Sequence, residues 1–180
     1  MSESPAVVFA ADEQNDVAVD LPRWTRLADF VLSEERERVP AESELSLIFI
    51  GETDMAELNE RFLDVKGPTD VLAFPMDEEE DDPRRRSRFP DQGGRGPGVP
   101  AEHGGPPLLL GDVVVCPAVA RRQAEERAIE VDAEIALLVV HGILHLLDYD
   151  HAEPAEAEVM GQRQTGLVSA FLAADAERGT

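Results

Sequence analysis

Cysteine, lysine and long apolar runs are scarce in this sequence of 180 residues, and each shortage excludes something. Cys116 is the only cysteine, so the chain cannot form an internal disulfide, which fits a reducing compartment. The most apolar stretch, residues 135–147, is too short to span a membrane and contains two histidines. Residues 1–20 are acidic and lack the pattern of a signal peptide. We therefore expect a cytoplasmic protein with no membrane partner.

Positive charge is also scarce. The chain has 38 acidic and 16 basic residues, Lys66 being the only lysine, and its net charge is −22. A protein that binds free nucleic acid is normally basic, so this balance excludes strong non-specific affinity for RNA or DNA. It leaves room for a local basic face or a small cleft.

The length and the hydrophobic content of 43% fit one domain, residues 1–180, with a core of its own. Apolar runs and periodicity predict strands at residues 6–11, 45–50, 69–75 and 108–116. Helices are expected at residues 21–39, at 117–129 and 132–147, and from 154 onward. A further helix is expected through residue 62, with Thr53 or Asp54 as its N-cap. Because the two types are mixed without strict alternation, we expect an α+β fold with a single small mixed four-stranded sheet packed with about five helices.

Residues 77–107 break this pattern. They contain an acidic run, a cluster of four arginines, and then many glycines and prolines, without apolar periodicity. This composition predicts a mobile insertion in contact with solvent. The arginine cluster offers a contact with RNA, but the neighbouring acidic residues nearly cancel its charge.

The most informative residues are two histidines in the apolar stretch 135–147, which we expect to form a central buried helix. His141 and His145 are four residues apart and therefore lie on one face of that helix. A buried imidazole without a partner costs about 1–3 kcal/mol. Two histidines at this spacing can direct their nitrogens at one metal ion, which explains both.

His151 is a candidate for a third ligand if the chain reverses direction near Asp148. Three neutral histidines suit Zn²⁺ and leave a fourth position open for water, whose pKa zinc lowers towards ~7. Asp148, Asp150 and Glu153 are candidate acceptors that orient the ligand rings. The remaining histidine, His103, is not expected to bind metal.

Zinc peptidases use the same ligand intervals, with a glutamate after the first histidine as the general base. Here that position is Gly142, which cannot accept a proton. The peptidase interpretation therefore lacks its essential base.

Three segments in order resemble the YbeY family of bacterial rRNA maturation factors. Residues 141–151 (HGILHLLDYDH) resemble its metal motif. Residues 58–59 and 67–75 (LN and GPTDVLAFP) resemble its Asn and Pro-Thr-Asp signature. Residues 110–116 (LGDVVVC), continuing to 123–124, resemble its Gly-Asp-Ile strand and the following helix. The similarity covers about residues 45–171, the insertion excepted.

The resemblance implies one zinc per chain, held by His141, His145 and His151. It further implies a single-strand-specific endoribonuclease that matures the 3′ end of small-subunit 16S rRNA and acts in ribosome quality control. The implied partners are rRNA, the ribosomal small subunit or its proteins, and a ribosome-assembly GTPase. Because of the acidic surface, we expect weak activity on free RNA and productive binding on a ribosomal particle, where basic ribosomal proteins fit an acidic face.

Three positions depart from the family pattern. Asp148 replaces a glycine that permits a left-handed turn, and Ala73 replaces a serine. Leu63 replaces an arginine associated with activity, which leaves Arg61 and Lys66 as candidates for stabilising the phosphate charge. The alternative to an enzyme is therefore a non-catalytic ribosome-assembly factor with a structural zinc.

Overall fold

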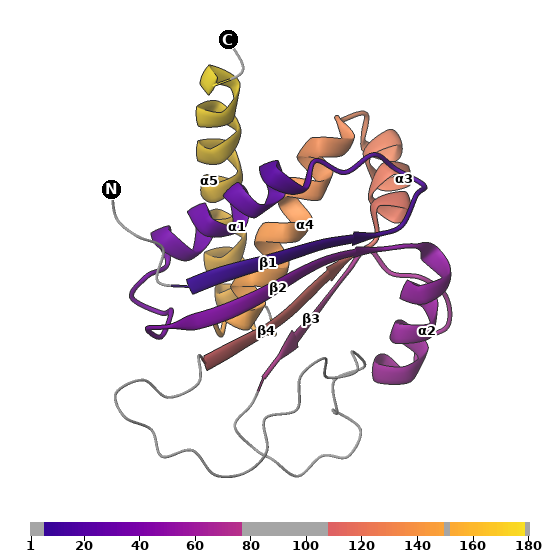
Figure 1. Cartoon of the computed structure of the whole chain (residues 1–180), viewed down its shortest axis with the longest axis horizontal. Coiled ribbons are helices and arrows are strands. Elements are labelled where there is room, and N and C mark those ends of the chain that lie inside the picture. Colours follow the sequence, from indigo (N-terminus) through magenta and orange to yellow (C-terminus); the bar gives the residue numbers. More distant parts are fainter. Residues whose placement is uncertain (1–5, 77–107, 150–151, 179–180) are drawn as a thin grey trace.

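The four strands form one mixed sheet in the order β1-β2-β4-β3 (Figure 1). A computed structural model describes residues 6–76, 108–149 and 152–178. The strands are β1 (Ala6–Glu13), β2 (Ser43–Ile50), β3 (Val71–Pro75) and β4 (Leu108–Val115). β1 pairs with β2 and β2 with β4 in parallel, whereas β3 pairs with β4 antiparallel. The expected mixed four-stranded sheet is confirmed.

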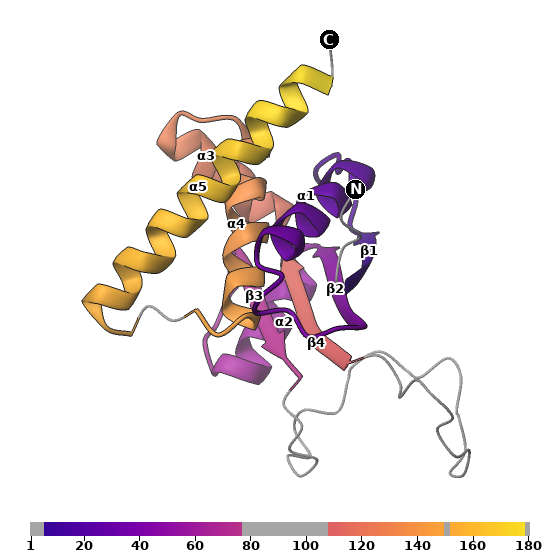
Figure 2. The same ribbon diagram turned by 90° about the vertical axis from the view of Figure 1, so that its left-hand side faces the viewer.

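Five helices accompany the sheet in the described residues. The helices are α1 (Leu21–Glu34), α2 (Glu52–Leu63), α3 (Pro117–Arg127), α4 (Val131–Leu146) and α5 (Pro154–Arg178). α1 and α4 pack on one face of the sheet, and α5 lies on the outer side of α4 (Figures 1 and 2). α1, α4 and α5 enclose the main core, in which α4 lies closest to the centre. Met55 of α2 belongs to a second core cluster with Ile48 of β2 and Leu72 of β3. No helix among the described residues is long and apolar enough to cross a membrane.

The end of α1 and the start of α2 differ from the sequence prediction for identifiable local reasons. α1 ends at Glu34, five residues before the predicted end at 39, because Glu35 caps it and binds groups on other elements. α2 begins after Gly51, whose φ of −75° and ψ of 168° place it in the extended region, so neither Thr53 nor Asp54 caps it. The predicted insertion at 77–107 lies outside the described residues.

Gly111 marks an irregularity in the centre of the sheet. Its φ is 138°, in the region that favours glycine, and it lies where the β2–β4 register shifts. A Cβ built there would lie 2.2 Å from the backbone oxygen of Phe74. The close approach of β3 to β4 therefore depends on the absence of a side chain at this position.

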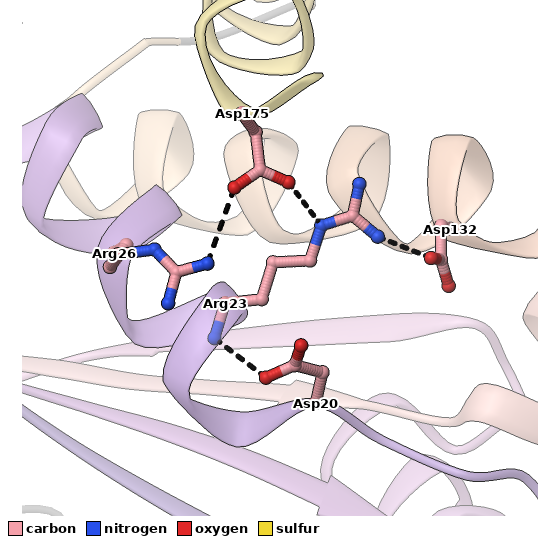
Figure 3. Close-up of polar contacts among 5 residues, drawn as sticks. All are labelled: Asp20, Arg23, Arg26, Asp132 and Asp175. Carbon is pink, nitrogen blue, oxygen red and sulfur yellow. Dashed lines mark hydrogen bonds and ion pairs between the residues drawn. The ribbon is translucent and has the colours of Figure 1, made fainter. Parts of the chain in front are cut away.

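A cluster of ion pairs joins α1 to the C-terminal half of α5 and to the start of α4 (Figure 3). Arg23 of α1 contacts Asp132 of α4 and donates from Nε to Oδ2 of Asp175 at 2.7 Å. Arg26 reaches the other oxygen of Asp175 at 3.2 Å, and Asp20 caps α1 through the Arg23 amide. Burial alone would raise the pKa of Asp175, but the hydrogen bonds and charges of both arginines lower it. This cluster fixes the path of α5 across α4.

Candidate metal centre

α4 presents two imidazoles on one face, as the four-residue spacing predicts. Nε2 of His141 and Nε2 of His145 lie 3.1 Å apart, and the rings meet edge to face at 79°. Both residues are half-buried, while Val140 and Leu144 on the neighbouring positions are fully buried in the core. The helix that carries the pair is therefore rigidly packed, and both ring nitrogens converge on one point.

Gln164 of α5 sets which nitrogen of His141 faces His145. Its Oε1 lies 2.8 Å from Nδ1 of His141, so Nδ1–H donates to the amide oxygen. The lone pair of His141 is then on Nε2, at the 3.1 Å contact with His145. The contact is compatible with the His141 tautomer in which Nδ1 carries the proton and Nε2 the lone pair, which is the tautomer that a metal ligand needs.

The geometry of the pair fits a zinc ion. In a tetrahedral site, Zn–N bonds of about 2.0–2.1 Å place two ligand nitrogens about 3.3 Å apart. The observed separation of 3.1 Å between the two Nε2 atoms is close to this value. Within residues 6–76, 108–149 and 152–178 no group of three His, Cys, Asp or Glu side chains surrounds one point. The predicted third ligand, His151, lies outside those residues, as does Asp150.

The chain turns sharply after α4, at the residue where the sequence analysis expects a reversal. Asp148 has a φ of 61°, which is the left-handed conformation. The Tyr149 amide donates to the Leu144 carbonyl at 3.0 Å, and the Asp148 amide donates to the His145 carbonyl at 3.3 Å. These two bonds form a Schellman motif with aspartate at the position that favours glycine.

Replacing Asp148 by glycine should therefore stabilise the protein. Glycine adopts a positive φ without steric cost, so we expect the unfolding free energy to rise by about 1 kcal/mol. Urea denaturation followed by circular dichroism measures this change. The control is Asp148→Ala, which lacks the tolerance of aspartate for this conformation and should give no gain. Equal gains in both variants would contradict the role of the turn.

Glu35 is the centre of a second polar cluster, beside the turn after α4. This carboxylate is 6% exposed, accepts a hydrogen bond from the Tyr149 hydroxyl at 3.0 Å and pairs with Arg163 of α5. Burial and then the hydrogen bond to Glu35 raise the pKa of Tyr149. Arg38 lies over the Tyr149 ring, 4.4 Å from its centroid. The cluster ties the end of α1, the turn and α5 together next to the histidine pair.

The candidate phosphate-stabilising residues are on the surface. Arg61 is exposed in the last turn of α2, with its guanidinium 5.3 Å from the centre of the Phe62 ring. Lys66 is exposed in the loop between α2 and β3. Leu63, at the position of the family arginine, is 57% exposed. The roles of Arg61 and Lys66 remain predictions.

Two further expectations concern Cys116 and Gly142. Cys116, the last residue of the predicted strand 108–116, is fully buried between β4 and α3, and burial raises the pKa of its thiol. Gly142 faces the sheet, because a Cβ built there would lie 2.6 Å from Cγ1 of Val113. A side chain at this position has no room beside the sheet, which is a second argument against a peptidase base at residue 142.

Gln164 is the residue of the site that the sequence analysis does not identify. Of the predicted ring acceptors, Asp148 and Glu153 lie within the described residues, and both are exposed. The group that contacts Nδ1 of His141 is instead the side chain of Gln164 on α5. Met160 and Leu167 are buried four residues before and three residues after Gln164. A polar residue in an apolar stripe is the sequence signal that would have pointed to it.

Comparisons with known proteins agree with the motifs. Residues 9–172 match the family described as Endoribonuclease YbeY. A curated Endoribonuclease YbeY from Frankia casuarinae is 42% identical over 168 residues, which cover 93% of this chain and 76% of the relative. One from Beutenbergia cavernae is 42% identical over 160 residues, covering 89% of this chain and 94% of the relative.

A solved structure confirms the fold. The solution structure of TM1509 from Thermotoga maritima matches 96% of this chain and 93% of its own, with a TM-score of 0.57 and 21% identity. At that identity the likeness supports the α+β architecture alone. The family match over residues 9–172 and the curated relatives establish the relationship. This chain belongs to the Endoribonuclease YbeY family.

Proposed function

We propose that this protein is a zinc-dependent, single-strand-specific endoribonuclease that matures the 3′ end of small-subunit rRNA and acts in ribosome quality control. The observation that carries the proposal is the pair of Nε2 atoms 3.1 Å apart on a buried helix. Membership of the family supports the reaction class, because its curated members are named as endoribonucleases.

His141, His145 and His151 are the proposed ligands of one zinc ion. Zinc at this site supplies Lewis acidity for the hydrolysis of a phosphodiester bond. The chain holds the proposed ligands in place, because α4 is packed in the core and Gln164 contacts the His141 ring at Nδ1. Arg61 and Lys66 are the proposed cations for the charge that develops on the phosphate oxygens.

The acidic surface determines how RNA reaches the site. A net charge of −22 repels free RNA, most strongly at low salt. We therefore propose that productive binding takes place on the ribosomal small subunit, whose basic proteins neutralise the acidic face. A ribosome-assembly GTPase is a further proposed partner.

One observation favours a second candidate function, a non-catalytic assembly factor with a structural zinc. Leu63 is exposed and uncharged at the position where the family has arginine. Without a cation close to the phosphate, the site would bind a particle without cleaving it rapidly. The two functions differ in whether rRNA cleavage requires the zinc ligands.

The proposed function is tested by incubating the protein with a single-stranded RNA and with the same sequence as a duplex. We expect the zinc-loaded protein to cleave the single strand slowly and the duplex not at all. Cleavage of the single strand should vanish after zinc is removed with a chelator. Readdition of zinc should restore cleavage, which controls for damage by the chelator. Cleavage that persists without zinc contradicts the proposal. If free RNA is not cleaved, the same test on small-subunit particles decides between the enzyme and the assembly factor.

A further inference from the structure

Gln164 is a polar residue at a position of α5 where the helix otherwise places apolar side chains. Met160, Leu167 and Phe171 are the buried residues of α5, and with Gln164 they form one stripe at spacings of three and four residues. An apolar side chain would continue this stripe. An amide is found instead, with its oxygen 2.8 Å from Nδ1 of His141, 23 residues earlier in the chain.

The path of α5 is fixed on both sides of Gln164. The preceding residue, Arg163, pairs with the buried carboxylate of Glu35 and donates to the Glu34 carbonyl at 3.3 Å. Farther along the helix, Asp175 binds Arg23 and Arg26 of α1 (Figure 3). Ion pairs and apolar contacts therefore hold α5 in the position that places the amide of Gln164 beside His141.

The amide oxygen favours one tautomer of His141. An oxygen can only accept, so the ring proton is kept on Nδ1 and the lone pair on Nε2. That lone pair faces Nε2 of His145 at 3.1 Å. Without an acceptor at Nδ1, the proton is free to move to Nε2, where it opposes metal binding.

We propose that Gln164 is a positioning residue of the metal centre, which holds His141 in the orientation and tautomer that bind zinc. This inference rests on the proposed zinc site and adds the residue that preorganises it. Groups that orient a histidine ligand in this way typically contribute about 10–100-fold to metal affinity.

The test compares three variants of the full chain. Gln164→Leu removes the acceptor and continues the apolar stripe, so it should fold. Gln164→Glu keeps an acceptor oxygen in a side chain of the same length. Gln162→Leu is the matched control, because Gln162 is an exposed glutamine on the same helix that donates to Glu158 at 3.0 Å.

Two measurements are made on each protein: the affinity for Zn²⁺, by competition with a chelating dye, and the tautomer of His141 in the zinc-free protein, by ¹⁵N NMR of the imidazole. We expect Gln164→Leu to lose about 10–100-fold in zinc affinity and to shift the His141 proton from Nδ1 to Nε2. Gln164→Glu should stay close to the parent in both, and so should Gln162→Leu. The tautomer is the readout that a merely structural role of Gln164 would not move.

The inference is overturned if Gln164→Leu binds zinc as tightly as the parent, or if the parent has its His141 proton on Nε2. A parent that binds no zinc overturns the zinc site and this role of Gln164 together. If only the endoribonuclease proposal is wrong, the result differs. Zinc affinity then depends on Gln164 as expected, but the zinc-loaded protein cleaves neither free RNA nor the rRNA of small-subunit particles.

Discussion

Replacing Gly142 by alanine is expected to lower the unfolding free energy by about 2 kcal/mol, because α4 lies too close to the sheet for a methyl group. A Cβ at this position would lie 2.6 Å from Cγ1 of Val113 and 3.3 Å from Cγ2 of Val71. Val113 is fully buried and β-branched, so its side chain cannot rotate away without a clash elsewhere. Relief requires α4 to move off the sheet, which displaces the adjacent His141.

Gly166→Ala in α5 is the matched control for this prediction. Within the part of the chain that the structure describes, nothing lies within 4 Å of a Cβ built at Gly166. Alanine should therefore raise the unfolding free energy there by about 0.5–1 kcal/mol, through its higher helix propensity. Urea denaturation of both variants gives the comparison. A gain of stability at Gly142 similar to that at Gly166 would show that α4 is not seated as closely as the structure indicates.

Local apolar pattern was sufficient to predict the elements of this fold. The strand at residues 45–50 and the helix at 132–147 are nearly continuous apolar runs, and both lie in the core as β2 and α4. The prediction fails at the end of α1, where Pro40 is the first residue that breaks a helix but the helix stops at Glu34. The carboxylate of Glu35 is held there by Tyr149 and Arg163, which no local pattern can reveal.

In the candidate site, too, the local features were predictable from the sequence and the contacts between distant elements were not. The spacing of His141 and His145 places them on one face of a helix, and the structure brings their Nε2 atoms to 3.1 Å. The turn at Asp148 was also predictable, because few residues other than glycine, asparagine and aspartate adopt its conformation readily. Spacing marks Gln164 only as a polar residue in an apolar stripe of α5. Its contact with His141 was not predictable, because it depends on how α5 crosses α4.

The orientation of His141 depends on how α5 is docked, because two neighbouring polar residues of α5 contact other elements. Arg163 and Gln164 are adjacent in sequence, yet one binds Glu35 at the end of α1 and the other binds His141 on α4. Burial of Glu35 at 6% exposure makes its pairing with Arg163 necessary, because a buried unpaired carboxylate is strongly destabilising. Correct docking of α5 is thus a condition for the observed orientation of His141, the first of the proposed ligands.

His145→Ala is expected to reduce RNA cleavage by more than about 100-fold, beyond what the loss of a group outside the ligand shell typically costs. The variant removes one of the two imidazoles that converge at 3.1 Å and leaves the other with its Gln164 contact. His145 is half-buried in the last turn of α4, and alanine is a good helix former, so the fold should persist. Circular dichroism and urea denaturation check that the variant is folded before cleavage is measured.

The fourth histidine supplies the matched control, because His103→Ala makes the same substitution at a residue that is not a proposed ligand. We expect His103→Ala to cleave single-stranded RNA and to process small-subunit rRNA as the parent does. If folded His145→Ala processes rRNA as well as the parent, the catalytic proposal is wrong and the zinc site is structural. If His145→Ala still associates with small-subunit particles but leaves their rRNA uncut, binding and cleavage are separate properties of the protein. Cleavage then depends on the histidine pair, whereas association with the particle does not.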